Sequence, residues 1–136
     1  MTTSCALAAV QREPKPAAID ENHLGRMTLG DRRLEREVLE LFLRQTTIML
    51  ERIIGAEPSL AAAAAHTLKG SARGIGAWRV AGAAEILEHA AGRADAHADD
   101  HDLEDALAEL KAASLEAGAA IAARLTALFD ELGAHR

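Results

Sequence analysis

The segment Pro58–Gly76, PSLAAAAAHTLKGSARGIG, decides the fold of this 136-residue chain, because its ends and its periodicity together indicate one amphipathic helix. Proline is favoured in the first turn of a helix, where its missing N–H is not needed, and a glycine commonly follows the last turn. Alanine, the strongest helix former, fills much of the interior. We therefore predict a helix that starts at Pro58 and ends at Gly74 or Gly76.

The same segment has a buried face and an exposed face. At about 100° per residue, with His66 at zero, the apolar side covers roughly 120° to 240°. The residues expected to be buried there are Leu60, Ala61, Ala64, Leu68, Ser71, Ala72 and Ile75. The residues that fall within about 60° of the histidine are Ser59, Ala62, Lys69, Gly70 and Arg73. We expect this second group to share the face of His66 and to be open to a partner.

Amphipathic helices flank this segment on both sides. Asp31 can cap one that ends at Gly55, and another runs from about 77 to 91 with Gly92 as its expected C-cap. A long final helix follows the polar stretch 93–102 and closes at Gly133. The residues expected on the inner sides of these helices are Leu34, Val38, Leu41, Phe42, Gln45, Ile48, Met49 and Ile53 in the first, Val80, Ala83, Ala84, Leu87 and Ala91 in the second, and Leu103, Ala106, Leu107, Leu110, Ala113, Ala117, Ala120, Ile121, Leu125, Leu128, Phe129 and Leu132 in the last.

The predicted fold class is all-α. One tryptophan, two phenylalanines and no tyrosine leave no good strand candidate, and the length suits a single domain. Four amphipathic helices joined by short connections pack most simply as an antiparallel up-down-up-down four-helix bundle. We assign this bundle to residues 19–136, with a short N-terminal helix near Ile19 or Asp20 and a flexible N-terminal arm at 1–18.

Composition and charge narrow the class of function. The net charge of −6 argues against nonspecific nucleic-acid binding, which needs a basic surface to displace counterions from phosphates. No stretch has the 18 or more consecutive apolar residues of a membrane span, and residues 1–10 lack the positive start of a secretory signal. We therefore expect a cytoplasmic protein with no membrane partner. The lone Cys5 is assigned no role.

His66 combines exposure with useful neighbours. A neutral imidazole nitrogen is a nucleophile at physiological pH and can take a phosphoryl group. Phosphoryl transfer asks mainly for in-line positioning and for cations around the phosphoryl oxygens. A histidine on a rigid helix with Lys69 one turn away supplies both. The competing interpretation is an ordinary surface histidine.

Gly70 is unexpected inside a helix, where glycine costs about 1 kcal/mol relative to alanine. A missing side chain one turn from His66 gives clearance for the active site of a partner. The alternative is that Gly70 marks the start of the helix end, but the apolar periodicity continues to Ile75. We therefore favour clearance.

The charge around His66 is locally positive along the chain. Residues 58–84 contain Lys69, Arg73 and Arg79 and no acid, so this segment is +3 and the remainder of the chain is −9. A basic patch on an acidic protein suits an acidic partner pocket and a phosphoryl group. The residues predicted to bind a partner are Ser59, Ala62, Arg73 and Arg79.

The run His66-Thr67-Leu68-Lys69-Gly70-Ser71-Ala72, followed by Gly76, Ala77, Val80 and Glu85, resembles the signature of the histidine-containing phosphotransfer (HPt) domain family. The four-helix pattern extends the similarity over roughly 25 to 132, although only about 60 to 90 carry a specific motif. Arg73 and Gly74 depart from the family pattern by adding bulk and flexibility beside the docking face.

The resemblance implies a role for each matched residue. His66 would be the phosphorylated residue, Lys69 would help to neutralise the phosphate, and Gly70 would give a receiver domain room to dock. Such a protein accepts phosphate from a receiver aspartate or a sensor kinase and passes it to the receiver of a response regulator. It has no cofactor or metal of its own, since Mg²⁺ is held by the receiver.

The chain carries no phosphate-cradling G-x-x-x-x-G-K-[ST] loop, so we expect a phosphocarrier without ATP binding or autokinase activity. The alternative function is a helical interaction module that binds a receiver or kinase without carrying phosphate. A third possibility is a metal-binding bundle that uses His89, His97 and His101, although a solvated loop explains the acid-rich stretch around them equally well.

Trp78 is interpreted as a packing residue rather than a docking aromatic. His23 and His135 belong to no recognisable constellation. The oligomeric state stays open, although apolar residues on the helix ending near Leu132 are compatible with a dimer.

Overall fold

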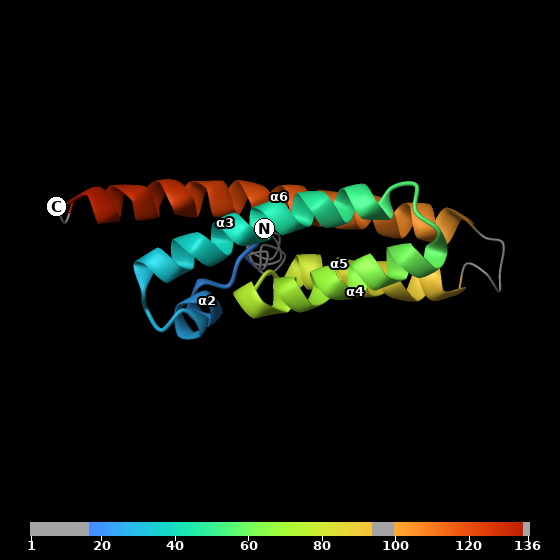
Figure 1. Ribbon diagram of the computed structural model, residues 1–136, viewed down its shortest axis with the longest axis horizontal. Helices are drawn as coiled ribbons and strands as arrows, with labels where there is room; N and C mark the ends of the chain where they lie inside the picture. The colour runs from blue at the N-terminus through green and yellow to red at the C-terminus, as the bar shows by residue number, and fades with distance from the viewer. Residues whose placement is uncertain (1–16, 94–99, 135–136) are drawn as a thin grey trace, which may run out of the picture.

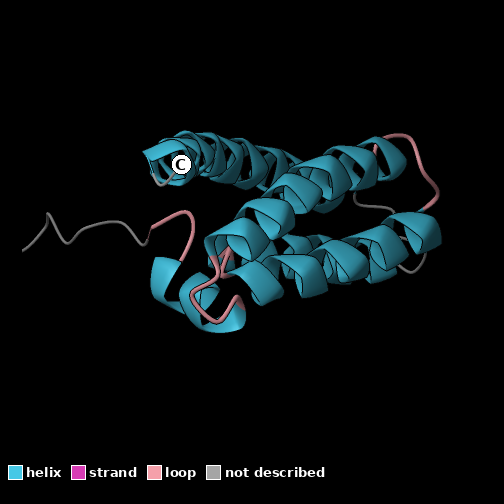
Figure 2. Ribbon diagram, turned by 60° about the vertical axis from the view of Figure 1, so that its left-hand side comes forward, coloured by secondary structure: helices cyan, strands magenta, loops and turns pink. Residues whose placement is uncertain are grey.

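The computed structural model describes residues 17–93 and 100–134, and every regular element within them is a helix (Figure 2). The short α2 (Glu21–Met27) precedes four longer helices, which are α3 (Arg32–Ile53), α4 (Pro58–Ile75), α5 (Trp78–Arg93) and α6 (Asp100–Ala134). The prediction of an all-α fold is confirmed.

The four long helices form the predicted antiparallel bundle (Figure 1). Both α4 and α6 contact α3 and α5, so α4 and α6 occupy opposite corners of the bundle. The short α2 packs against α4 at one end. Figure 1 also shows that the C-terminal end of α6 extends beyond the start of α3.

The predicted helix ends are mostly correct. The side chain of Asp31 accepts hydrogen bonds from the first free N–H groups of α3, and Pro58 opens α4 as expected. Gly76 ends α4 in the left-handed conformation, with φ of 81°. The prediction that Gly92 is the C-cap was wrong, because α5 continues through this residue to Arg93.

The last helix differs from expectation at both of its ends. The last helix begins at Asp100, within the stretch expected to be polar loop, and runs through Gly133 to Ala134. At the other end, Asp20 caps α2, in agreement with the predicted short helix. Most of the predicted arm, residues 1–16, lies outside the described residues, and so do His97 and His135.

The core lies between the four helices. Its largest fully buried side chains are Leu24, Leu39, Leu68, Val80, Leu87, Leu110, Ile121 and Leu128. Buried alanines on α4 and α5, among them Ala65, Ala72 and Ala84, leave little side-chain bulk between these two helices. Small residues allow close approach of helix axes, and α4 and α5 pack extensively against each other.

Some expected core residues are exposed. Leu60 is 62% exposed and Phe129 is 70% exposed, while Leu34, Leu41 and Ile48 are also at the surface. Leu60 stands at the edge of the predicted apolar arc and in the first turn of α4, where neighbouring helices cover less of the surface. Helical periodicity alone does not identify which apolar residues meet a neighbour.

Glu35 shows the opposite deviation, because it is a carboxylate only 2% exposed in the inner face of α3. Arg124 on α6 donates two hydrogen bonds of 3.0 Å to its two oxygens. This bidentate pair satisfies the buried carboxylate and raises the pKa of Arg124. A buried ion pair therefore ties α3 to α6.

A cluster at the start of α2 fixes this short helix to the bundle. The indole N–H of Trp78 donates to the Asp20 carboxylate at 3.0 Å, and this bond is the main cause that lowers the pKa of Asp20. The His23 ring lies 4.8 Å from the Trp78 ring and donates from Nε2 to the Arg73 carbonyl at 3.0 Å. Trp78 thus packs as predicted, whereas the expectation that His23 belongs to no constellation was wrong.

Candidate functional site

His66 lies near the middle of α4, and its side chain is 67% exposed. The buried residues Ala65, Leu68 and Ala72 hold the opposite side of the helix against the core. The exposed placement predicted from the helical wheel is confirmed. The histidine is therefore presented to solvent on a helix whose position is fixed by packing.

Glu88 on α5 bridges His66 and Lys69. Its Oε2 lies 2.6 Å from Nδ1 of His66, and its Oε1 lies 2.7 Å from Nζ of Lys69. The two α4 residues are one helical turn apart, so a single carboxylate opposite them reaches both. We call His66, Lys69 and Glu88 the clamp.

The clamp fixes the chemistry of the imidazole ring. A carboxylate only accepts hydrogen bonds, so Nδ1 of His66 carries the proton and donates it to Glu88. In the neutral ring Nε2 then holds the free electron pair. No hydrogen bond among the described residues engages Nε2, so the exposed ring offers this nitrogen as nucleophile.

Glu88 stays ionised below the usual titration range of glutamate. Its pKa is lowered first by the hydrogen bond from Lys69 and then by the bond from His66, against an opposing effect of burial. The bridging carboxylate therefore remains charged throughout the neutral range.

No acid lies near His66 in the sequence, but in the folded structure acids of α5 lie beside the cations of α4. Lys69 is paired with Glu88 and is only 13% exposed, and Arg73 lies 3.8 Å from Glu85. The interpretation of residues 58–84 as an acid-free basic patch was therefore wrong. The sequence could not reveal these pairs, because they depend on how α4 and α5 align.

Arg79 is not part of the surface around His66. It is ion-paired with Glu116 on α6, and it lies about half a turn around α5 from Glu88. By contrast, Ser59 and Arg73 are exposed and Ala62 is half-buried on the side of α4 that carries His66. The structure brings three of the four predicted partner-binding residues to the histidine and places the fourth elsewhere.

Gly70 is exposed on α4, and a Cβ added there would meet no heavy atom within 4 Å. The helix continues past it to Ile75, so the alternative that Gly70 begins the helix end is wrong. Internal packing therefore gives no reason for glycine at this position. Because Gly70 has no side chain, nothing protrudes from the helix surface at this position beside His66.

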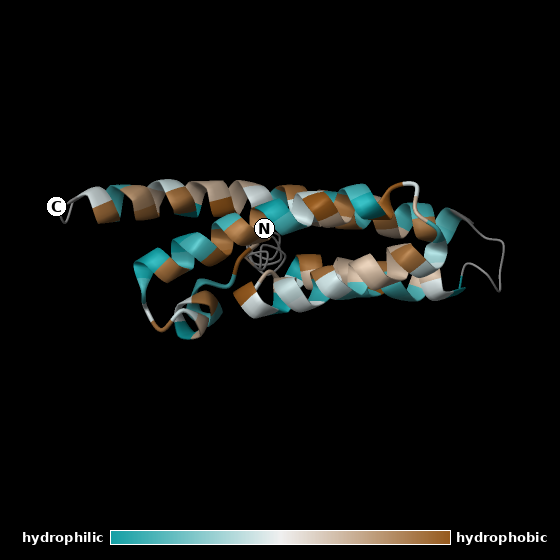
Figure 3. Cartoon of the chain, viewed as in Figure 1, coloured by the Kyte–Doolittle hydropathy of each residue, from teal (hydrophilic) through white to brown (hydrophobic). Residues whose placement is uncertain are grey.

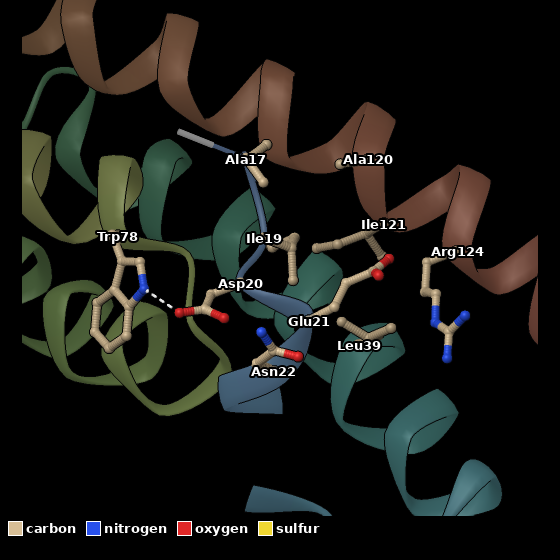
Figure 4. A pocket seen from close by; sticks show the side chains of 11 residues that line it. Ala17, Ile19, Asp20, Glu21, Asn22, Leu39, Trp78, Ala120, Ile121 and Arg124 are labelled. Atoms are coloured by element: carbon tan, nitrogen blue, oxygen red, sulfur yellow. Dashed lines mark hydrogen bonds between the residues drawn. The ribbon is translucent and has the colours of Figure 1, made fainter. Parts of the chain in front are cut away.

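A cavity of about 650 Å³ lies between the start of α2, α3 and α6, beside Trp78 at the first residue of α5 (Figure 4). Two of its polar side chains are already engaged, Asp20 with Trp78 and Arg124 with Glu35. None of the clamp residues lines it. The cavity is therefore separate from the phosphoryl chemistry considered for His66.

Within residues 17–93 and 100–134, no group of three potential metal ligands comes together. His89 and His101 are exposed on α5 and α6. The third histidine of the metal-binding alternative, His97, lies outside the described residues, so this alternative is not tested.

Comparison with known proteins identifies a family. The model of the Hpt domain family matches residues 37–135, which include α4, α5 and the whole clamp. Comparisons with curated proteins and with solved structures give no match.

Proposed function

Because the chain belongs to the Hpt domain family, we propose that it carries a phosphoryl group on Nε2 of His66, between a receiver aspartate or sensor kinase and a response regulator. Membership of the family implies a part in histidine phosphotransfer within phosphorelays. The observation that carries the proposal is the clamp, which leaves Nε2 free on an exposed ring.

The transfer step follows from the protonation of the ring. The Nε2 electron pair attacks the phosphorus of an aspartyl phosphate, the P–O bond to the aspartate breaks, and the aspartate leaves as a carboxylate. The ring gains positive charge as the N–P bond forms, and Glu88, hydrogen-bonded to Nδ1–H, stabilises that charge. In the next transfer an aspartate of the second receiver attacks the same phosphorus, and the neutral ring with Nδ1–H is restored.

Lys69 acts in this scheme through its place in the clamp. Its ammonium is held by Glu88 one turn from the phosphorylated ring. A cation there stabilises the negative charge on the phosphoryl oxygens, and it also keeps Glu88 ionised. Lys69 is therefore proposed to have two roles: it stabilises the charge of the phosphate, as expected, and it orients Glu88.

The partner is proposed to dock on the side of α4 that carries His66. Gly70 leaves space there, Ala62 and Ser59 are small, and Arg73, 53% exposed, offers a cation to an acidic receiver pocket. Mg²⁺ is proposed to sit on the receiver and not on this chain. No role in docking is proposed for Arg79.

We propose a cytoplasmic phosphocarrier without kinase activity of its own. One helix, α6 over His101–Gly133, is long and apolar enough by composition to span a membrane. It nevertheless supplies Leu110, Ile121 and Leu128 to the bundle core, and its Arg124 pairs with the buried Glu35. These contacts favour a bundle helix over a membrane span.

The test is incubation of the protein with a phosphorylated receiver domain. The expected result is an acid-labile, base-stable label that is lost in His66→Gln and retained in His89→Gln, an exposed histidine on α5 that serves as control. A label that persists in His66→Gln overturns the proposal. Receiver binding that is equal in wild type and His66→Gln, with no phosphohistidine in either, would instead identify a pure interaction module.

A further inference from the structure

The outward side of α6 carries a continuous apolar stripe. Its members follow one another at alternating steps of four and three residues, and all are exposed: Ala108, Ala112, Leu115, Ala119, Ala122, Thr126, Phe129 and Gly133. We call this set the α6 seam. Alternating steps of four and three residues are the spacing at which two helices pack along a shared seam.

The seam is distinct from the core side of the same helix. The buried residues of α6 include Leu110, Ala117, Ile121 and Leu128, which face α3 and α5. Leu115 is 78% exposed and Phe129 is 70% exposed, although both are large apolar side chains. In an 18-residue apolar window within α6, only 28% is buried, and Figure 3 shows hydrophobic residues along its whole length.

The single polar side chain of the seam is satisfied within its own helix. The Thr126 hydroxyl donates to the Ala122 carbonyl at 3.1 Å, which leaves its methyl group for packing. The seam can therefore be covered without burying an unpaired polar side chain.

We propose that the α6 seam is the docking surface for a second copy of this chain, with the two α6 helices parallel. In a parallel pair each seam residue meets its own equivalent, so Leu115 packs on Leu115 of the second copy and Phe129 on Phe129. The alanines between them let the two backbones approach closely.

The charges at Lys111, Glu116 and Asp130, beside the middle and later part of the seam, favour a parallel copy over an antiparallel one. Lys111 and Glu116 stand on opposite margins, five residues apart, which is the spacing that joins oppositely charged residues across a parallel helix pair. Glu116 is still 41% exposed beside Arg79 and can accept a second cation. In an antiparallel pair with Leu115 against Phe129, Glu116 would instead lie near Asp130 of the second copy, and the two acids would repel.

The size of the seam predicts a weak dimer. It extends over about 38 Å of helix at 1.5 Å per residue, and one helix pair of that length lies at the low end of protein interfaces, below roughly 1,200 Å². Dimerisation should therefore depend on concentration. Because α4 and α6 occupy opposite corners of the bundle, the histidine of each copy would remain open to a receiver.

Sedimentation of the full chain from low micromolar to millimolar concentration tests the proposal. The wild type should shift from monomer to dimer, and Leu115→Glu or Phe129→Glu should weaken the dimer by about tenfold or more. Leu60→Glu, the same change at an exposed leucine of α4, should leave dimerisation unchanged. Circular dichroism checks that each variant is folded. A wild type that stays monomeric, or a dimer insensitive to both α6 changes, overturns the proposal.

Disulfide trapping tests the orientation in a Cys5→Ser background. Ala112→Cys should form a disulfide-linked dimer, because residue 112 comes within disulfide reach of its own equivalent in the parallel pair but not in the antiparallel pair that places Leu115 against Phe129. A mixture of Leu115→Cys and Phe129→Cys should give disulfides between identical chains. A predominant mixed disulfide between the two variants would show an antiparallel pair and overturn the parallel arrangement.

Discussion

Glu88 on α5 accepts a 2.6 Å hydrogen bond from Nδ1 of His66 on α4, so the ring that carries the proposed chemistry is oriented by a residue of another helix. The same carboxylate holds Lys69 at 2.7 Å. The reactive nitrogen, the cation and the carboxylate thus form one unit whose parts can be tested separately.

Replacing Glu88 should slow phosphotransfer without removing it. In Glu88→Gln the side chain keeps its shape but loses the charge that stabilises the ring as the N–P bond forms, and a loss of about tenfold is expected for this kind of charge-assisted bond. Single-turnover transfer from a phosphorylated receiver measures the effect. Glu85→Gln, which alters an acid beside Arg73, serves as the control. Equal rates in wild type and Glu88→Gln would show that the carboxylate only packs.

The titration of Glu88 should depend on Lys69. The pKa of Glu88 lies below the ordinary value of 4.5, chiefly through the Lys69 hydrogen bond, so Lys69→Ala should raise it toward that value. Because the folded-state pKa is lowered, the stabilising effect of the ionised clamp is present above the unfolded-state pKa and is lost as pH falls through the folded-state pKa. Carbon-detected NMR of the carboxyl group measures this directly. An unchanged midpoint in Lys69→Ala contradicts the assignment, and Arg73→Ala is the matched control.

Gly70→Gln should block docking while the fold is kept. No heavy atom within 4 Å opposes a side chain there, and glutamine favours helix over glycine, so stability should be unchanged or raised by up to about 1 kcal/mol. Transfer and receiver affinity should both fall. Gly82→Gln on α5, an exposed helical glycine with equal space, should affect neither. Parallel loss of thermal stability and transfer in Gly70→Gln would show a structural role.

Arg124→Gln should destabilise the bundle by about 3 kcal/mol or more, because it leaves the buried Glu35 carboxylate without its bidentate partner. Urea unfolding followed by circular dichroism measures the change. The double variant with Glu35→Gln should recover part of the loss. Arg32→Ala, which removes a cation that is 51% exposed, should change stability by less than about 1 kcal/mol.

The sequence predicted the elements of this protein better than the contacts between them. The periodicity around His66 placed it correctly on the exposed side of α4, because that property depends on one helix alone. Glu88 was missed because it lies 22 residues away, and its role depends on how α4 and α5 align. Glu35 was missed because glutamate is expected at the surface, and the bidentate partner that accompanies its burial lies on another helix, α6.

On α6 the apolar periodicity did not predict burial correctly for every residue. Phe129 was expected in the core since it continues the spacing of buried residues, yet this helix has two apolar sides and only one of them meets the bundle. Gly92 illustrates a similar limit at a helix end, because glycine ends a helix only where the backbone takes a left-handed conformation, as it does at Gly76.

The pairing of Lys69 with Glu88 also sets what a partner encounters before and after transfer. With a neutral imidazole the three clamp side chains sum to zero charge, since one cation and one anion cancel. The phosphoryl oxygens add close to two negative charges and the ring, which keeps its Nδ1 proton, gains one positive charge, so the same surface carries a net charge of about −1 once loaded. Under the proposed function, the loaded and empty proteins present different electrostatic surfaces to the same receiver, and the affinity of that receiver for each can differ without any movement of the helices.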